Sequence, residues 1–255
     1  MNTRAQIQLI VIALAAAFIG CSDTDGANGT EGEGDYAITV YGEEFVEDKI
    51  PADETDGWEI EFSRFEVTVS DISASNDDGE TASVDGVHTV ELTEDSAGEG
   101  HLVAEVVAPA GRYESLDYRI APDDDQPALL VEGTATKDDE TKSFSWAFDT
   151  DALYEDCQTD AHIDDGGSAT SQLTIHADHF FYDDLVAEEP NLAFDLIASA
   201  DADDDGDVTL DELADVDITA ESRYQVGSHD ITDLRGFLEA QSTTVGHIDG
   251  EGHCD

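Results

Sequence analysis

The chain has 255 residues, of which 63 are Asp or Glu and nine are Lys or Arg, so its formal net charge at pH 7 is -54. Such a charge argues against nucleic acid as a partner and against direct adsorption to anionic lipid, because both would repel the protein. Hydrophobic residues make up 40% of the chain, which excludes a disordered acidic tail and indicates a folded protein with a very acidic surface.

The acidic residues are spread along the chain rather than gathered in one block. Uniform acidity of this kind resembles that of proteins from salt-adapted organisms. In concentrated salt the Debye length falls to a few ångströms, so the self-repulsion of the surface is largely screened. We therefore expect a halophilic protein. The alternative is a locally acidic, cation-buffering protein from an ordinary habitat.

The first residues have the features of a secretion signal. Arg4 is followed by an apolar run over residues 9–19, which is too short to span a bilayer comfortably. The run ends in the letters FIGC, which resemble the lipobox of bacterial lipoproteins. This resemblance implies a signal peptide over residues 1–20 and a lipid on Cys21. Cleavage after Ala17, which would leave a soluble secreted protein, is the alternative.

Residues 21–35 are mostly Gly, Asp, Glu and Thr, so we expect a flexible acidic tether. The lipid implied at Cys21 would hold the protein on a membrane. Ser22 after the cysteine favours the outer membrane of a Gram-negative cell, by resemblance to known sorting behaviour, with the periplasmic and surface faces both open. The sequence identifies no protein or glycan partner.

Two cysteines, Cys157 and Cys254, remain once Cys21 carries lipid. An exported chain can keep such a pair oxidised, so we expect a disulfide that ties the C-terminus to the middle of the chain. Two free thiols and a metal-binding pair are the alternatives.

Short segments with alternating apolar residues fill the chain from residue 36 to about residue 187. A one-residue slip in the alternation between Phe62 and Phe65 predicts a β-bulge, because without it the second half of the strand would turn inside out. These segments predict an antiparallel β-sandwich over residues 36–187. The expected strands lie at residues 36–41, 58–69, 87–92, 102–107, 113–120, 129–135, 144–148 and 173–175.

A turn supports this fold class by resemblance. PAGRY at residues 109–113, which follows VELTED at residues 90–95, is similar to turns in bacterial envelope β-sandwich lipoproteins of unassigned function. Such a sandwich can bind carbohydrate or protein through exposed aromatic residues. Trp58 and Trp146 are the candidates, although their alternating context is also typical of a core.

Residues 201–212 read DADDDGDVTLDE, the pattern of an EF-hand calcium loop. Calcium is a hard cation that takes six to eight oxygen ligands, and Gly206 at the sixth position permits the sharp turn that the loop needs. Chance is the alternative in a chain so rich in Asp. The resemblance implies as Ca²⁺ ligands the side chains of Asp201, Asp203, Asp205 and Glu212, the backbone carbonyl of Asp207, and the hydroxyl of Thr209 or a water.

Helical periodicity is confined to residues 188–255, which we expect to form a small helical segment. One helix is expected to begin at Pro190, a second to follow the calcium loop, and a third to span residues 230–241. EF-hands usually occur in pairs, and no second loop is present. We therefore expect the single hand to pack on the sandwich edge or on the helix at residues 230–241, as a static site.

His176 and His179 lie in the segment IHADHFFYDD, which also contains Asp178, Asp183 and Asp184. Imidazoles three residues apart can hold Zn²⁺ or Cu²⁺ if the strand ends between them. In the alternative, one histidine caps a strand end and the other contacts a carboxylate.

Two further histidines, His247 and His253, are candidates for the same site, but the sequence does not fix their distance from His176.

The chain contains no nucleophile elbow, zinc-protease motif or phosphate-binding loop, so we predict that it is not an enzyme. The favoured hypothesis is a lipid-anchored cell-envelope protein in which Ca²⁺ has a structural role. A transition-metal-binding protein that uses His176 and His179 is the alternative, and adhesion by the sandwich is a third.

Overall fold

The computed structural model describes residues 32–250, 252 and 254. The expected signal peptide, Cys21 and His253 lie outside these residues. The first strand begins at Glu33, so the last three residues of the expected tether belong to the sheet instead. No helix among the described residues is long and apolar enough to cross a membrane.

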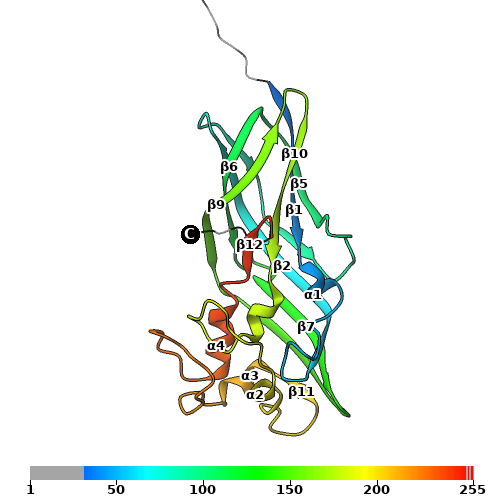
Figure 1. Cartoon of the computed structure of the whole chain (residues 1–255), viewed down its shortest axis with the longest axis vertical. Coiled ribbons are helices and arrows are strands. Elements are labelled where there is room, and N and C mark those ends of the chain that lie inside the picture. Colours follow the sequence, from blue (N-terminus) through cyan, green and yellow to red (C-terminus); the bar gives the residue numbers. More distant parts are fainter. Residues whose placement is uncertain (1–31, 251, 253, 255) are drawn as a thin grey trace, which may run out of the picture. The chain divides into compact units, whose positions relative to one another are not determined.

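Two β-sheets form the body of the protein, and most helices gather at one end of them (Figure 1). The first sheet has the order β12 (Gly246–Ile248), β10 (Ser168–Ile175), β1 (Glu33–Tyr41), β5 (His101–Pro109). The second has the order β11 (Asp207–Val208), β8 (Glu140–Phe148), β7 (Leu129–Lys137), β2 (Glu59–Asn76), β6 (Gly111–Ile120), β9 (Ala152–Ile163). Two short strands, β3 (Thr81–Val84) and β4 (His88–Glu91), also pair with β2.

The prediction of a mainly antiparallel sandwich followed by a small helical segment is confirmed. Two pairs differ by being parallel, namely β1 with β10 and β8 with β11. Strand β2 carries the expected irregularity, because its register with β7 shifts between Phe62 and Arg64. The shift keeps both Phe62 and Phe65 buried, as the interrupted alternation predicted.

Four strands, β3, β9, β11 and β12, are missing from the sequence prediction. β9 alternates between buried and exposed residues except at the exposed pair Glu155 and Asp156. Its buried positions include small or polar residues such as Ala152, Cys157 and Thr159, so it carries a weak hydrophobic signal. β11 and β12 both follow residues 173–175, which were wrongly predicted to be the last strand. Through these strands the C-terminal segment adds to both sheets, because β12 pairs with β10 in the first and β11 with β8 in the second.

The helices are short: α1 (Glu43–Glu47), the 3₁₀ helix η1 (Ala177–Phe181), α2 (Asp195–Ala198), α3 (Leu210–Ala214) and α4 (Leu234–Gln241). The prediction that a helix begins at Pro190 is wrong, since α2 begins five residues later. Asp183 and Asn191 exchange hydrogen bonds through their backbones and side chains, which holds the chain after Pro190 extended. The third predicted helix is present as α4, whose N-cap Asp233 accepts a hydrogen bond from Gly236 N at 2.9 Å.

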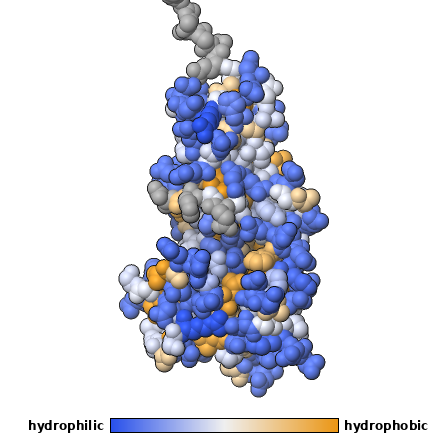
Figure 2. Space-filling model, viewed as in Figure 1, coloured by the Kyte–Doolittle hydropathy of each residue, from blue (hydrophilic) through white to orange (hydrophobic). Residues whose placement is uncertain are grey.

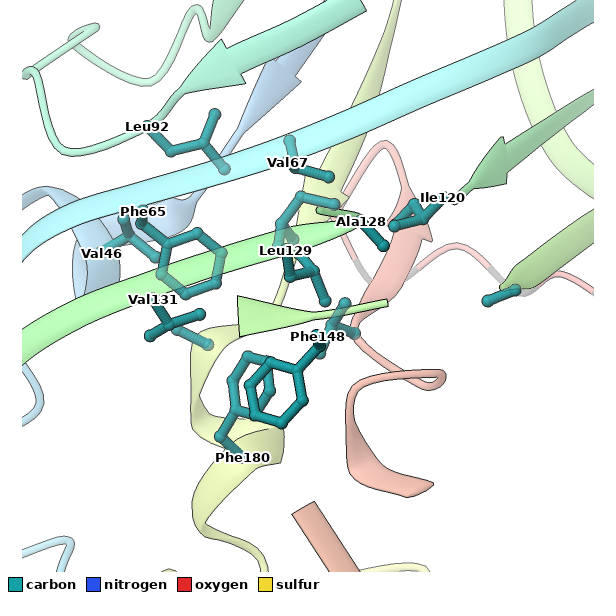
Figure 3. Packing of buried hydrophobic residues seen from close by; sticks show 14 of the residues in the cluster. Val46, Phe65, Val67, Leu92, Ile120, Ala128, Leu129, Val131, Phe148 and Phe180 are labelled. Atoms are coloured by element: carbon teal, nitrogen blue, oxygen red, sulfur yellow. The ribbon is translucent and has the colours of Figure 1, made fainter. Parts of the chain in front are cut away.

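Aromatic and branched side chains fill the space between the layers (Figure 3). Phe180 of η1 stacks on Phe148 at 5.1 Å between ring centres and also meets the ring of Phe65. The side chains drawn around them include Leu129 and Val131 of β7. Because Phe180 is fully buried, it fixes η1 against the sheets.

Both tryptophans belong to this core, since Trp58 is 2% exposed and Trp146 is fully buried. Neither presents the exposed ring that carbohydrate adhesion was expected to use. Hydrophilic residues instead cover most of the face seen in Figure 2, in keeping with the acidic composition.

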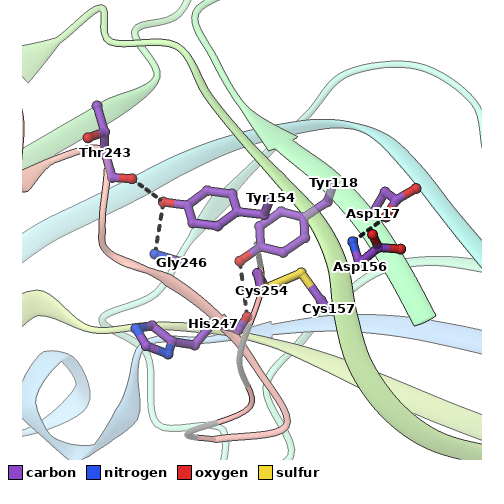
Figure 4. The surroundings of a disulfide bond; sticks show 9 residues. All are labelled: Asp117, Tyr118, Tyr154, Asp156, Cys157, Thr243, Gly246, His247 and Cys254. Carbon is purple, nitrogen blue, oxygen red and sulfur yellow. Dashed lines mark hydrogen bonds between the residues drawn. A yellow bond between two sulfur atoms is a disulfide. The ribbon is translucent and has the colours of Figure 1, made fainter. Parts of the chain in front are cut away.

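The chain end is held to β9 by a disulfide between Cys157 and Cys254, the pair expected from the cysteine count (Figure 4). Beside it, Tyr118 and Tyr154 stack at 4.7 Å between ring centres and bind the backbone around β12. Gly246 is required there, because a Cβ atom would come within 2.5 Å of the Tyr118 hydroxyl. These contacts fix β12 in place.

Candidate metal centres

Asp201, Asp203 and Asp205 converge at the start of the predicted calcium loop. One carboxylate oxygen from each lies within 4.8 Å of the others. Gly206 follows with φ of +90°, a conformation that side chains rarely adopt, and so supplies the turn for which the sixth position was singled out. Three converging hard oxygen donors suit Ca²⁺ by their chemistry.

The carboxylate of Asp201 is the buried centre of this cluster, with a side chain that is 0% exposed. It accepts hydrogen bonds from Lys142 Nζ at 2.7 Å, from Gly206 N at 3.0 Å and from Asp205 N at 3.1 Å. The contact with Lys142, and after it these backbone donors, lowers the pKa of Asp201. The carboxylate is therefore held charged and oriented by the protein itself.

Glu212 lies at the other end of the loop and is not one of the three converging carboxylates. Its side chain accepts hydrogen bonds from the backbone and hydroxyl of Thr209, which caps α3, and from Ala202 N at 3.2 Å. The backbone donor of Thr209 is the largest of the influences that lower the pKa of Glu212. Glu212 thus ties the last residue of the loop to its second.

The loop is docked on the sandwich through β11, which pairs with β8 in register Asp207 to Ser143 and Val208 to Phe144. Ser143 N donates to Gly206 O at 2.8 Å, and the buried indole of Trp146 donates to Val208 O at 2.9 Å. Asp207 also accepts a hydrogen bond from the Ser143 hydroxyl through its side chain. Strand β8 therefore pairs with the predicted calcium loop at the place where a paired EF-hand would have its second loop.

The helix that leaves the loop packs on α4. Leu234 N, at the start of α4, donates to Val216 O just beyond α3 at 3.1 Å, and Arg235 lies 3.7 Å from the carboxylate of Asp211. The sandwich edge and the third helix were offered as alternative supports for the single hand. The structure uses both.

His176 and His179 come together where β10 ends. The strand stops at Ile175 and η1 begins at Ala177, so the chain turns between the two histidines and their ring centres lie 5.3 Å apart. From the sequence, we expected that the two histidines could bind one ion only if the strand ended between them, and it does. His176 is 5% exposed and His179 is partly buried.

His247 joins this pair from β12. In the antiparallel pair of β10 and β12, Thr174 lies opposite His247. Two residues further along, His176 N donates a hydrogen bond to Val245 O. His176 and His247 are therefore diagonal neighbours on the same face of the sheet. The ring centre of His247 lies 4.3 Å from that of His176 and 5.4 Å from that of His179. The sequence named His247 only as a candidate.

Two carboxylates flank His176. Glu43 Oε2 lies 3.4 Å from His176 Nδ1, and Asp178 Oδ1 lies 4.0 Å from the same nitrogen. The second oxygen of Asp178 accepts a hydrogen bond from the Tyr182 hydroxyl at 2.8 Å. Glu43 was not predicted, because it stands more than 130 residues before the histidines and no local pattern marks it.

The surroundings of His179 favour its neutral form. Burial, and after it the proximity of His176 and His247, lowers the pKa of His179 to about 3. The Nε2 atom of His176 is buried and has no hydrogen-bond partner among the described residues.

The other two acidic residues of the IHADHFFYDD segment serve elsewhere. Asp183 binds Arg223 Nε at 2.8 Å, and Asp184 caps the turn at Val186.

No protein-family model matches this chain, and no curated protein or solved structure is significantly similar to it. The two centres are therefore distinguished by their own chemistry. The loop at residues 201–212 offers carboxylate and carbonyl oxygens. The second centre offers imidazoles together with the carboxylate of Asp178, since one ligand atom from each of His176, Asp178 and His179 lies within 4.8 Å of the others.

Proposed function

We propose that the protein is a lipid-anchored cell-envelope protein that binds Ca²⁺ at residues 201–212. The ion has a structural role and holds the C-terminal helical segment against the sandwich. The observation that carries this proposal is the docking of the loop on β8 with Asp201, Asp203 and Asp205 converging beside it. The fold thus provides both the carboxylate ligands and the strand, β8, that holds the loop in place.

The charge around the loop explains why an ion would matter. Three carboxylates converge, Asp204, Asp207 and Glu212 lie in the same twelve residues, and Lys142 is the cation that contacts the cluster. Like charges held this close repel each other, and a bound divalent ion offsets the repulsion in the folded state alone. An ion present at a hundred times its dissociation constant would stabilise the fold by about 2.7 kcal/mol.

The anchor rests on the lipobox resemblance at Cys21 and on the tether that follows it. The folded part begins at Glu33, which leaves about a dozen residues as a spacer between a lipidated Cys21 and the first strand. We propose attachment to the outer membrane, without enzymatic activity. In concentrated salt the acidic surface would remain soluble beside an anionic membrane.

The experiment is a Ca²⁺ titration of the protein stripped of metal, in concentrated NaCl, followed by thermal melting. We expect the melting temperature to rise with Ca²⁺. Asp203→Asn should abolish most of this rise in melting temperature. The variant should keep its metal-free fold, because the carboxylate of Asp203 makes no hydrogen bond or ion pair with the described residues. Asp124→Asn, in an exposed acidic turn, is the matched control. A melting temperature that Ca²⁺ does not change would refute the structural role.

A further inference from the structure

We propose that His176, His179 and His247 form a binding site for a divalent transition-metal ion of the kind that imidazole prefers, with Zn²⁺ or Cu²⁺ as the occupant. This centre is separate from the calcium loop and does not depend on the function proposed for it. His176 follows β10, His179 lies in η1 and His247 lies in β12. The sequence alone named His247 only as a further candidate, at an unknown distance from the other two.

The spacing of the rings fits a shared ion. Zinc–nitrogen bonds of about 2 Å at tetrahedral angles place the centres of two ligating imidazoles roughly 5 Å apart. The three distances between ring centres here are 4.3, 5.3 and 5.4 Å. One ligand atom from each of His176, His179 and Asp178 lies within 4.8 Å of the others, and the ring of His247 adjoins this group. Three protein ligands would leave a fourth position for solvent or an exogenous ligand.

Hydrogen bonding selects the nitrogen that His179 can offer. The Thr244 hydroxyl donates its proton to Gln241 O at 2.9 Å, so it can only accept from His179 Nδ1, which lies 3.0 Å away. Nδ1 of His179 therefore carries the hydrogen, and its Nε2 keeps the lone pair that a metal needs.

The same arrangement holds at His176. Its Nδ1 faces the carboxylates of Glu43 and Asp178, which favour a hydrogen on that nitrogen. The other nitrogen, Nε2, is left as an acceptor in a buried position with no partner among the described residues. Metal-binding histidines commonly donate their second nitrogen to a carboxylate in this way, which fixes the ring and makes it a stronger ligand.

Packing alone gives a poorer account of the cluster. A buried imidazole nitrogen without a hydrogen bond costs free energy, and Nε2 of His176 is in that position among the described residues. A metal ion would satisfy its lone pair. The surroundings also hold the ligands rigidly, because Phe180 and Phe181 anchor η1 in the core and the tyrosine pair holds β12.

The test is a Zn²⁺ titration of the full chain in concentrated NaCl, with Ca²⁺ in excess so that the calcium loop is saturated. A competing chromophoric chelator reports the affinity. We expect one tightly bound Zn²⁺ per chain. His179→Gln and His247→Gln should each weaken binding by tenfold or more, and Glu43→Gln by about tenfold through the orientation of His176. His229→Gln, which changes an exposed histidine, should leave binding unchanged.

The near-ultraviolet circular dichroism of each variant shows whether it is folded. Asp203→Asn should retain Zn²⁺ binding while losing its response to Ca²⁺, so the failure of either proposal is distinguishable from the failure of the other. The inference is overturned if folded wild-type protein does not bind Zn²⁺ or Cu²⁺ stoichiometrically. It is also overturned if folded His179→Gln and His247→Gln proteins both bind as the wild type does.

Discussion

The predicted calcium loop and the histidine cluster are built from the sequence in opposite ways. Twelve consecutive residues supply the loop, and the fold only has to dock it on β8. The histidines reach each other because β12 returns to pair with β10, more than 60 residues later in the chain. A site formed by consecutive residues can be predicted from the sequence, whereas a site assembled by strand pairing can be recognised only in the structure.

The two centres also differ in their electrostatics. The loop is acidic and largely exposed, apart from the buried Asp201 and Val208, and it suits a hard cation. In the histidine cluster His176 is buried and His179 and His247 are half-buried, and the imidazoles suit a softer ion. Because they rest on different strands, β8 and β12, we expect changes at one support to affect one centre and spare the other.

Removing the disulfide should have the largest effect. Cys157→Ala with Cys254→Ala opens a loop that spans 97 residues, so the free energy of unfolding should fall by about 4 kcal/mol. Urea unfolding in concentrated salt measures the change, with Cys21→Ser alone as the control. Since Cys254 follows β12, Zn²⁺ affinity should fall with stability while the folded protein keeps its response to Ca²⁺. If the variant lost Zn²⁺ affinity and the response to Ca²⁺ to the same extent, the two centres would not be independent.

The second-largest effect should come from alkaline pH, which should destabilise the fold at the contact between Tyr154 and β12. Burial raises the pKa of Tyr154 to about 12, against 10 for an exposed tyrosine. Between these values only the unfolded chain releases the proton, so the free energy of unfolding falls as the pH rises, by up to about 3 kcal/mol. Urea unfolding from pH 9 to pH 12 measures the slope. Tyr154→Phe should reduce the slope without abolishing it, because burial also raises the pKa of Tyr36, Tyr118 and Tyr224. An unchanged slope in that variant would contradict a contribution from Tyr154.

Val208→Ala tests the support of the calcium loop. Val208 is 1% exposed and pairs with Phe144 in β8, so truncation should cost about 2 kcal/mol. The Ca²⁺ concentration needed to raise the melting temperature should increase, and Zn²⁺ binding should be unaffected. Loss of Zn²⁺ binding in this variant would show that the two centres are coupled.

Gly246→Ala is the counterpart at the histidine cluster. A Cβ atom there would come within 2.6 Å of the Tyr154 ring and would push β12 outward, at a cost of about 1 to 2 kcal/mol. Zn²⁺ binding should weaken although no ligand has changed, while the shift that Ca²⁺ produces should remain. Intact Zn²⁺ affinity would mean that β12 does not position His247.

Much of the fold follows from local patterns, and the exceptions have physical causes. The bulge between Phe62 and Phe65 could be predicted, because large apolar residues mark both sides of it. β9 could not, since small and polar residues occupy part of its buried face. The helix expected at Pro190 is replaced by an extended segment, because the tertiary hydrogen bonds of Asp183 outweigh local propensity there.

The candidate sites show the same limit. Asp201, Asp203 and Asp205 could be predicted to meet, since their spacing alone determines it. For His176 and His179 the sequence supplied only a condition, namely that a strand ends between them. His247 and Glu43 depend on β12 and α1 packing beside η1, and no spacing in the sequence encodes that contact.

Hydrogen exchange of the full chain in concentrated NaCl, read by mass spectrometry with and without Ca²⁺, tests the structural role of the ion most directly. We predict that Ca²⁺ slows exchange in peptides that cover residues 201–214 and the facing part of β8, while peptides from β1 and β5 exchange as before. Exchange at residues 201–214 that Ca²⁺ leaves unchanged would contradict the account.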